Sequence, residues 1–322
     1  MKSICYVVPY FGRLPESFPL WLVSCKANPT VNWIIFTDDK TAYSYPKNVR
    51  VYYCSFGDMK KRIQENFDFP IVIDRGWKLC DFKIAYGEIF AKELAGYDFW
   101  GNCDVDLMWG NIRKFLTDEI LDKYEKIGFL AHSTLYRNTP EVNARYRTII
   151  DGLTDYKTAF SSSDGFAFDE VGIEAIYNHL GIEYYKEINF ANLTKYERKF
   201  HLDCFSEEEE YKNNRQVFTW KDGTLLRHYL YDGKIFDEEY MYIHFWCRPM
   251  SYKVSDYSDK NEYLIYSDVV SDKPFKLTQG LIKRKGISHP ITFYAKSIWK
   301  NRHKITLERI IFNIKGSLNK ND

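Results

Sequence analysis

About the first 110 residues alternate between short apolar runs and segments with helical spacing. Strand-like runs occupy 3–8, 32–37, 49–54 and 97–103, and helical spacing occupies 18–27, 58–66 and 81–94. Strands interleaved with helices are typical of βαβ units, whose strands lie parallel in one sheet. The alternation therefore predicts an α/β fold with a mixed, mostly parallel central sheet.

The pattern after residue 112 is less regular. We expect a strand at 126–131, helices at 142–153 and 169–181, and a last strand at 241–246. Two Asp-Gly turn signals, at 222–223 and 232–233, separate strand-like runs and predict hairpins within 217–242. Because no repeat or Pro/Gly/Ser-rich linker interrupts this part, we interpret residues 1–272 as one domain.

The C-terminal segment 273–322 is a separate electrostatic unit. It carries 12 Lys or Arg against two acids, a balance of +10, whereas the net charge of the 322-residue chain is only +1. Residues 1–272 therefore carry −9, which disfavours a nucleic-acid partner. Basic and apolar side chains interleave at helical spacing from 298 to 318, which predicts a basic amphipathic tail on an anionic membrane surface. The alternative is a helix that packs its apolar side on the domain.

The cysteines and the hydropathy bear on the compartment. Seven cysteines are scattered without a C-x-x-C pair, and no run approaches the roughly 20 apolar residues of a membrane-spanning helix. We therefore expect reduced thiols in a cytoplasmic protein that is peripheral on the inner face of the cell membrane.

The strongest chemical signal is the run Trp-Gly-Asn-Cys-Asp-Val-Asp, which ends in Asp104 and Asp106. Both carboxylates follow a predicted strand of the parallel sheet, at the edge where open α/β sheets bind ligands. Oxygen ligands suit Mg²⁺ or Mn²⁺, which usually takes one or two carboxylates together with phosphate oxygens of a substrate. The sequence predicts a divalent metal site here; the alternative is a turn whose aspartates cap the next helix.

This pattern resembles the A-type (GT-A fold) glycosyltransferases of bacterial polysaccharide biosynthesis, which carry an aspartate–any–aspartate motif after such a strand. The resemblance covers about residues 3–250 and implies a single Rossmann-like domain, Mn²⁺ or Mg²⁺ as cofactor and a nucleotide sugar, most often a UDP-sugar, as donor. The late strand containing His244 is similar to that of the lipopolysaccharide galactosyltransferase group, where a histidine is the third metal ligand. A histidine in an apolar strand also fits a hydrogen-bonded core position.

The resemblance also implies the residues that contact the nucleotide. They lie in the opening strand and its loop, at the end of the second strand, on the segment before the metal motif, and after the late strand: Pro9, Tyr10, Phe11, Asp38, Asp39, Lys83, Tyr86, Asp104 and Arg248. Arg248 suits a diphosphate because its planar guanidinium binds phosphate oxygens bidentately. Asp38 and Asp39 fit a strand-end turn equally well, and Lys83 fits a solvated helix face.

Three acids, Asp164, Asp169 and Glu170, precede the helix predicted at 169–181. One of them is expected to act as the general base on the acceptor hydroxyl, while Asp169 also fits a helix cap. The histidine strand favours retention of anomeric configuration and the Asp-Glu pair favours inversion, so the stereochemical course stays open.

The function expected from this resemblance is transfer of a hexose to a lipid-linked oligosaccharide acceptor in the synthesis of capsule or O-antigen. Two alternatives use the same residues. One is a metal-dependent nucleotidyltransferase or phosphohydrolase, and the other is a non-catalytic module that binds the nucleotide or the sugar.

Overall fold

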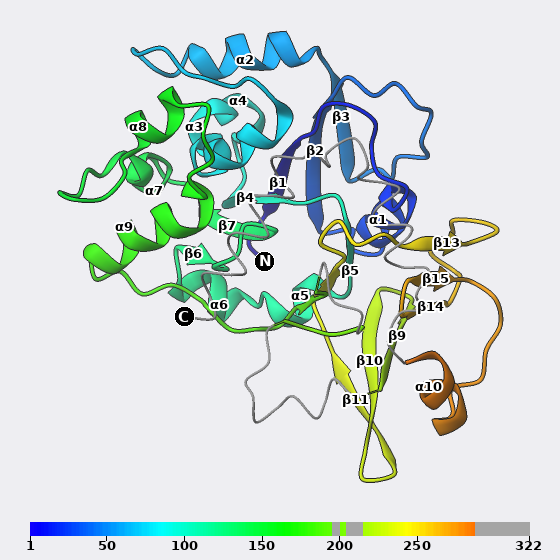
Figure 1. Cartoon of the computed structure of the whole chain (residues 1–322). Coiled ribbons are helices and arrows are strands. Elements are labelled where there is room, and N and C mark those ends of the chain that lie inside the picture. The colour runs from blue at the N-terminus through cyan, green and yellow to red at the C-terminus, as the bar shows by residue number, and fades with distance from the viewer. Residues whose placement is uncertain (195–199, 204–214, 287–322) are drawn as a thin grey trace, which may run out of the picture.

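The computed structural model describes residues 1–194, 200–203 and 215–286 (Figure 1). Its main sheet has six strands in the order β3-β2-β1-β4-β7-β6. β1 (Ile4–Pro9), β2 (Val31–Thr37), β3 (Val49–Tyr53) and β4 (Phe99–Cys103) are parallel, and β7 (Ser133–Arg137) and β6 (Lys126–Ile127) add antiparallel pairs at one edge. The α/β class and the mostly parallel first sheet are confirmed.

Both faces of the main sheet are covered, as its side chains require. Along β1, Cys5 and Val7 face one apolar cluster, while Tyr6 and Val8 face another on the opposite side. The second cluster is closed by α1 (Phe18–Lys26), α5 (Ile112–Phe115) and α6 (Asp118–Lys123). The first is closed by α2 (Phe56–Gln64), η1 (Gly76–Ala85), α3 (Tyr86–Ile89), α4 (Ala91–Leu94), α7 (Pro140–Ala144), η2 (Arg145–Arg147), α8 (Tyr156–Ser161), η3 (Phe168–Gly172) and α9 (Ile173–His179).

A second six-stranded sheet follows at the other end of the molecule (Figure 1), in the order β11-β10-β9-β14-β15-β13. Its strands are β9 (Gln216–Lys221), β10 (Thr224–Tyr231), β11 (Lys234–Glu239), β13 (Ser251–Lys253), β14 (Tyr263–Tyr266) and β15 (Val269–Ser271). The predicted hairpins β9–β10 and β10–β11 are confirmed, and both turns place Asp-Gly at positive φ.

Helix α10 (Gln279–Lys285) packs on this second sheet. Leu281 and Ile282 are buried against Val217 and Leu264. α10 thus covers the domain from within the segment 273–322 assigned to the tail, and 287–322 lies outside the described residues.

A three-stranded sheet joins the two ends. It contains β5 (Leu107–Trp109), β12 (Tyr242–His244) and β8 (Ala191–Asn192) in the order β5-β12-β8. In its register His244 pairs with Leu107 on one side and with Asn192 on the other. A late strand is thereby placed directly beside the residues that follow β4.

Three local predictions were wrong. Residues 81–94 form no continuous amphipathic helix but the η1–α3–α4 series, because the segment is buried on nearly every side and its charges are paired inside the protein. The strand expected at 126–131 ends at Ile127, and the helix expected at 142–153 ends within η2. In the part of the chain that the structure describes, no helix is long and apolar enough to cross a membrane.

Candidate metal centre

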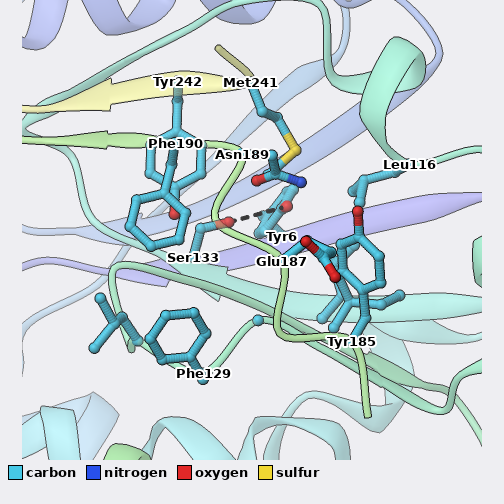
Figure 2. Close-up of a pocket in the computed structure, with 14 residues that line it drawn as sticks. Tyr6, Leu116, Phe129, Ser133, Tyr185, Glu187, Asn189, Phe190, Met241 and Tyr242 are labelled. Carbon is cyan, nitrogen blue, oxygen red and sulfur yellow. Dashed lines mark hydrogen bonds between the residues drawn. The ribbon is translucent and has the colours of Figure 1, made fainter. Parts of the chain in front are cut away.

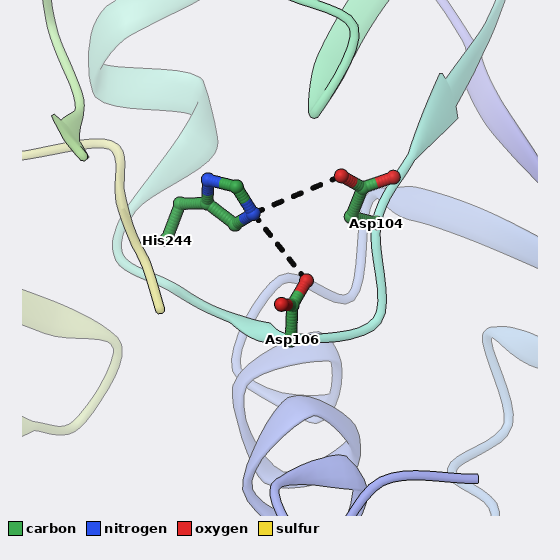
Figure 3. Close-up of side chains that lie close together, drawn as sticks. All are labelled: Asp104, Asp106 and His244. Atoms are coloured by element: carbon green, nitrogen blue, oxygen red, sulfur yellow. Dashed lines mark ion pairs between the residues drawn. The ribbon is translucent and has the colours of Figure 1, made fainter. Parts of the chain in front are cut away.

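Asp104, Asp106 and His244 converge at the carboxyl edge of the main sheet (Figure 3). His244 Nε2 lies 3.4 Å from Asp106 Oδ1 and 3.7 Å from Asp104 Oδ2. One ligand atom from each residue lies within 4.8 Å of the other two. The arrangement brings together the three residues that the sequence predicted as metal ligands, and their atoms surround one point.

The imidazole of His244 is held from behind by an amide. Its Nδ1 is 2.7 Å from Asn192 Oδ1, and Asn192 Nδ2 donates to Asp203 Oδ2 at 2.7 Å. The ring also packs against His132 with centroids 4.5 Å apart. Asn192 and Asp203 were not found from the sequence, where a two-residue strand leaves no periodic signal.

Asp106 is fixed by backbone donors. Its Oδ2 accepts a hydrogen bond from the Cys247 amide at 2.6 Å, and its carbonyl accepts one from Phe245 at 2.9 Å. Burial alone would raise the pKa of Asp106, but His244 and the hydrogen bond from Cys247 hold it well below the usual value. Trp246 and Cys247 both have positive φ, 46° and 53°, a strained turn of the kind often found at functional sites.

Lys83 links Asp104 to a buried acid. Its Nζ donates to Asp104 Oδ1 at 2.8 Å and lies 3.8 Å from Asp169 Oδ2. A third contact, 3.0 Å long, goes to the Ala131 carbonyl. Burial raises the pKa of Asp169 to about 7, although the Lys83 charge lowers it. Asp169 therefore titrates close to neutral pH beside the candidate metal centre.

The other two predicted acids do not reach this cluster. Glu170 Oε1 accepts a hydrogen bond from the Ala131 amide at 2.8 Å, so its carboxylate braces the chain next to Lys83. Asp164 is exposed, and its carbonyl accepts a hydrogen bond from Lys78. Of the three acids, the geometry favours Asp169 as the group beside the site.

The residues predicted to contact the nucleotide begin with those of the loop after β1. Pro9 ends β1, and Phe11 packs on Phe56 with ring centroids 5.3 Å apart. Tyr10 is half-buried, and burial raises its pKa, with the negative charges of Asp106 and Asp39 adding to the rise.

The loop after β1 is held by the two strand-end acids. Asp38 accepts a hydrogen bond from the Gly12 amide at 2.7 Å, and Asp39 accepts one from Leu14 at 2.9 Å. These bonds give Asp38 and Asp39 a structural role in shaping the loop that carries Tyr10.

Two of the predicted nucleotide contacts, Tyr86 and Arg248, are buried side chains. Tyr86 is 2% exposed in the core, where its hydroxyl donates to the Leu79 carbonyl at 3.4 Å. The Arg248 guanidinium donates to the Thr194 carbonyl. Each side chain thus has a hydrogen-bond partner inside the protein, and contact of either with a nucleotide stays a prediction.

A small cavity lies beside Tyr242, with Tyr6, Phe129 and Met241 also in its lining (Figure 2). Its volume of about 10 Å³ suits a single water and no larger ligand. Tyr6 and Ser133 form a 3.3 Å hydrogen bond in its wall. The Tyr242 hydroxyl is 2.8 Å from His132 Nδ1, so this wall supports the ring that packs on His244.

The donor set fits a divalent cation. Two carboxylates and an imidazole nitrogen can hold a divalent ion such as Mn²⁺ or Mg²⁺, since carboxylate oxygens suit both ions and imidazole is a common metal ligand. Asp104, Asp106 and His244 would hold the ion, leaving further coordination positions for water or substrate oxygens.

Comparison with known proteins assigns the sequence to a protein family. A family of unknown function (DUF6625) matches residues 6–274, from β1 through the second sheet. The chain belongs to this family. The DUF6625 region contains the candidate metal centre together with Asn192 and Asp203. No curated protein matches the sequence. Among solved structures, the mouse xyloside xylosyltransferase 1 in its apo form is similar at a TM-score of 0.39 and 10% identity, over 76% of this chain and 98% of that one.

Proposed function

We propose that this DUF6625 protein is a metal-dependent glycosyltransferase that uses a nucleotide sugar, with a UDP-hexose as the first donor to test. The observation that carries the proposal is the convergence of Asp104 and Asp106 with His244 from a distant strand. These groups meet at the carboxyl edge of a parallel sheet, where α/β proteins bind ligands. The aspartate–any–aspartate spacing and the late histidine are what the sequence resemblance implies for such enzymes.

Several residues of the chain are proposed to bind the donor around its diphosphate leaving group. A divalent ion held by the three ligands would neutralise charge that develops on a departing nucleoside diphosphate. Lys83 keeps a buried positive charge next to Asp104. The loop after β1, braced by Asp38 and Asp39, presents Tyr10 beside the same site. These groups bind and orient the donor.

Asp169 is the proposed proton acceptor for the acceptor hydroxyl. A general base works best when its pKa lies near the working pH, and burial brings the pKa of Asp169 to about 7. Its carboxylate lies 3.8 Å from Lys83 and thus close to the metal ligands. If Asp169 acts as the base in a single displacement, the product has the inverted anomeric configuration. A product with retained configuration would indicate another role for Asp169.

The proposed acceptor is a lipid-linked oligosaccharide of capsule or O-antigen synthesis at the inner face of a bacterial membrane. Support comes from the charge distribution, since residues 273–322 carry +10 and the rest of the chain −9. Three of these basic residues, Lys283, Arg284 and Lys285, lie together in the last turn of α10. Each cation near an anionic surface contributes about 1 kcal/mol to membrane binding.

A thermal-shift panel of nucleotide sugars with Mn²⁺ tests the donor, because a bound ligand raises apparent stability by mass action. The stabilising donor is then incubated with protein, Mn²⁺ and a glycolipid acceptor, and the products are identified by mass spectrometry. The proposal predicts free nucleoside diphosphate and a glycosylated acceptor. Pyrophosphate or nucleoside monophosphate would instead indicate a nucleotidyltransferase or phosphohydrolase, and stabilisation without turnover would indicate a binding module.

A further inference from the structure

We propose that Asn192 and Asp203 are positioning residues that hold His244 as the tautomer whose Nε2 faces the two aspartates, and that they thereby favour Mn²⁺ over Mg²⁺. The inference rests on the metal centre of the proposed function. It assigns a role to two residues outside the ligand set.

The chain of hydrogen bonds runs in one direction only. Asp203 offers carboxylate oxygens, so the group of Asn192 that faces it at 2.7 Å is the Nδ2 donor. The amide oxygen of Asn192 then faces His244 Nδ1 at 2.7 Å. Because an amide oxygen only accepts, Nδ1 carries the proton and donates it to Asn192. In the neutral ring this leaves the lone pair on Nε2, the atom that points at Asp104 and Asp106.

Backbone contacts keep the relay in register. Asn192 and His244 are paired neighbours on β8 and β12, and both side chains are at least 95% buried. The Leu193 amide donates to the His244 carbonyl at 3.0 Å, and the Asp203 amide donates to the Asn192 carbonyl at 3.1 Å. The relay is therefore built on paired backbone, and its side chains have little freedom to turn.

Arg248 contacts the segment that follows Asn192. Its guanidinium donates to the Thr194 carbonyl, and the Thr194 amide donates to the His201 carbonyl at 2.9 Å. The segment immediately after Asn192 is thus clamped on both sides. Arg248 is thereby tied to the segment that carries Asn192.

Asp203 decides which way the amide of Asn192 points. With Asp203 removed, Asn192 is free to turn its amide nitrogen toward His244, which forces the imidazole proton onto Nε2. A protonated Nε2 cannot bind a metal ion. A fixed direction of the amide is therefore required for nitrogen ligation, and loss of a group behind a ligating histidine typically changes metal affinity by 10–100-fold.

The cation preference follows from the same atom. Mg²⁺ prefers oxygen ligands and is held mainly by the carboxylates, whereas Mn²⁺ gains more from an imidazole nitrogen. Loss of the relay should consequently weaken Mn²⁺ binding much more than Mg²⁺ binding.

The test is calorimetric titration of the full chain with MnCl₂ and with MgCl₂. Asn192→Leu removes the acceptor and should raise the Kd for Mn²⁺ by 10–100-fold, with the Kd for Mg²⁺ changing less than threefold. Asp203→Ala should give the same direction with a smaller, roughly three- to tenfold effect. Asn189→Ala is the control, since it alters an asparagine of the same segment that lies outside the relay, and it should leave both constants unchanged.

A charge-neutral exchange guards against simple misfolding. In N192D/D203N the new acid accepts from His244 and the new amide donates to that acid, so Mn²⁺ affinity should return to within about threefold of wild type. Failure of the exchange to restore an affinity that N192L had lost would contradict the relay. So would wild-type Mn²⁺ affinity in folded N192L.

Nitrogen-15 NMR of the metal-free protein at pH 9 reads the tautomer directly, with H244A used to assign the signal. The relay predicts a proton on Nδ1 in wild type and a mixture of tautomers in N192L. A wild-type proton on Nε2 would overturn the inference. Failure of the proposed function is separate: Mn²⁺ binding that depends on Asn192, without any sugar transfer, would sustain the relay and exclude the transferase.

Discussion

His244 Nε2 lies 3.4 Å from Asp106 Oδ1, although one residue ends β12 and the other immediately precedes β5. The antiparallel pairing of these strands sets His244 opposite Leu107, the residue after Asp106. The contact is therefore a consequence of strand register. Any change that shifts this pairing by one residue would turn His244 to the other face of the sheet.

Asp169→Asn should make the metal-free protein more stable at pH 8 and less active. The carboxyl ionises near pH 7 when folded and near 3.8 when unfolded, so the folded chain binds the extra proton between these values. The contribution of the Asp169 carboxyl to the free energy of unfolding is most favourable below pH 3.8, and it is lost as pH rises through 7. The substitution should add about 2–4 kcal/mol to the free energy of unfolding at pH 8 and almost nothing at pH 4.

Urea unfolding in EDTA at the two pH values checks the stability change, with the exposed Asp151→Asn as control. The turnover number of D169N should fall by roughly 10²–10⁴-fold if this residue is the base. An equal stability gain at both pH values would show that the carboxyl does not titrate between them.

Lys126→Met should stabilise the protein most at and below neutral pH. Lys126 is 1% exposed, and burial lowers its pKa to about 7 from 10.5. Between these values the unfolded chain binds more protons, so the contribution of Lys126 improves as pH rises from 7 to 10.5. Met keeps an unbranched apolar side chain and removes the charge, together with the contact of Lys126 Nζ over the Tyr184 ring at 3.8 Å.

We expect K126M to gain roughly 2–4 kcal/mol in the free energy of unfolding at pH 6.5 and less than half of that at pH 9.5. Denaturant titrations at both pH values measure it, with the exposed Lys123→Met as the matched control. A destabilised K126M at pH 6.5 would mean that the Lys126 bond to the Gly128 carbonyl outweighs the cost of its buried charge.

Lys78→Met should destabilise the protein and loosen the loop that leads to Asp169. Lys78 is fully buried and donates to Asp81 at 2.8 Å and to the carbonyls of Ala159 and Asp164. Asp81 in turn accepts from the Phe168 amide at 3.0 Å. Removing the cation leaves a buried unpaired carboxylate, which costs about 3–5 kcal/mol.

Unfolding free energies and the rate of proteolysis between residues 161 and 168 report the two effects of K78M. Lys92→Met, an exposed lysine near the same core, is expected to change neither. Wild-type proteolysis in a destabilised K78M would separate the stability of the core from the order of the loop.

The parallel core and the two aspartates of the candidate metal centre were accessible from the sequence because their signals are local. An apolar run such as 3–8 marks a strand, and Asp104 with Asp106 directly follows another. Both Asp-Gly turns likewise predicted their hairpins, since few residues other than Gly and Asp tolerate positive φ there.

What the sequence did not reveal depends on non-local contacts. Asn192 gains its role only when the two-residue strand β8 pairs with β12, and no periodicity marks so short a strand. Lys83 was placed on an amphipathic helix because charges normally indicate solvent, whereas the fold buries it between two acids. Arg248 was expected on a diphosphate, and only the fold shows that a backbone carbonyl takes its guanidinium.

The rate of sugar transfer with and without chelator tests the metal-dependent mechanism most directly. Donor turnover by wild type should stop in EDTA and return when Mn²⁺ is added in excess. D104N/D106N should be inactive under both conditions, while the exposed Asp122→Asn should behave like wild type. Full activity of D104N/D106N in EDTA would contradict the account, because no cation held by these acids would then be needed.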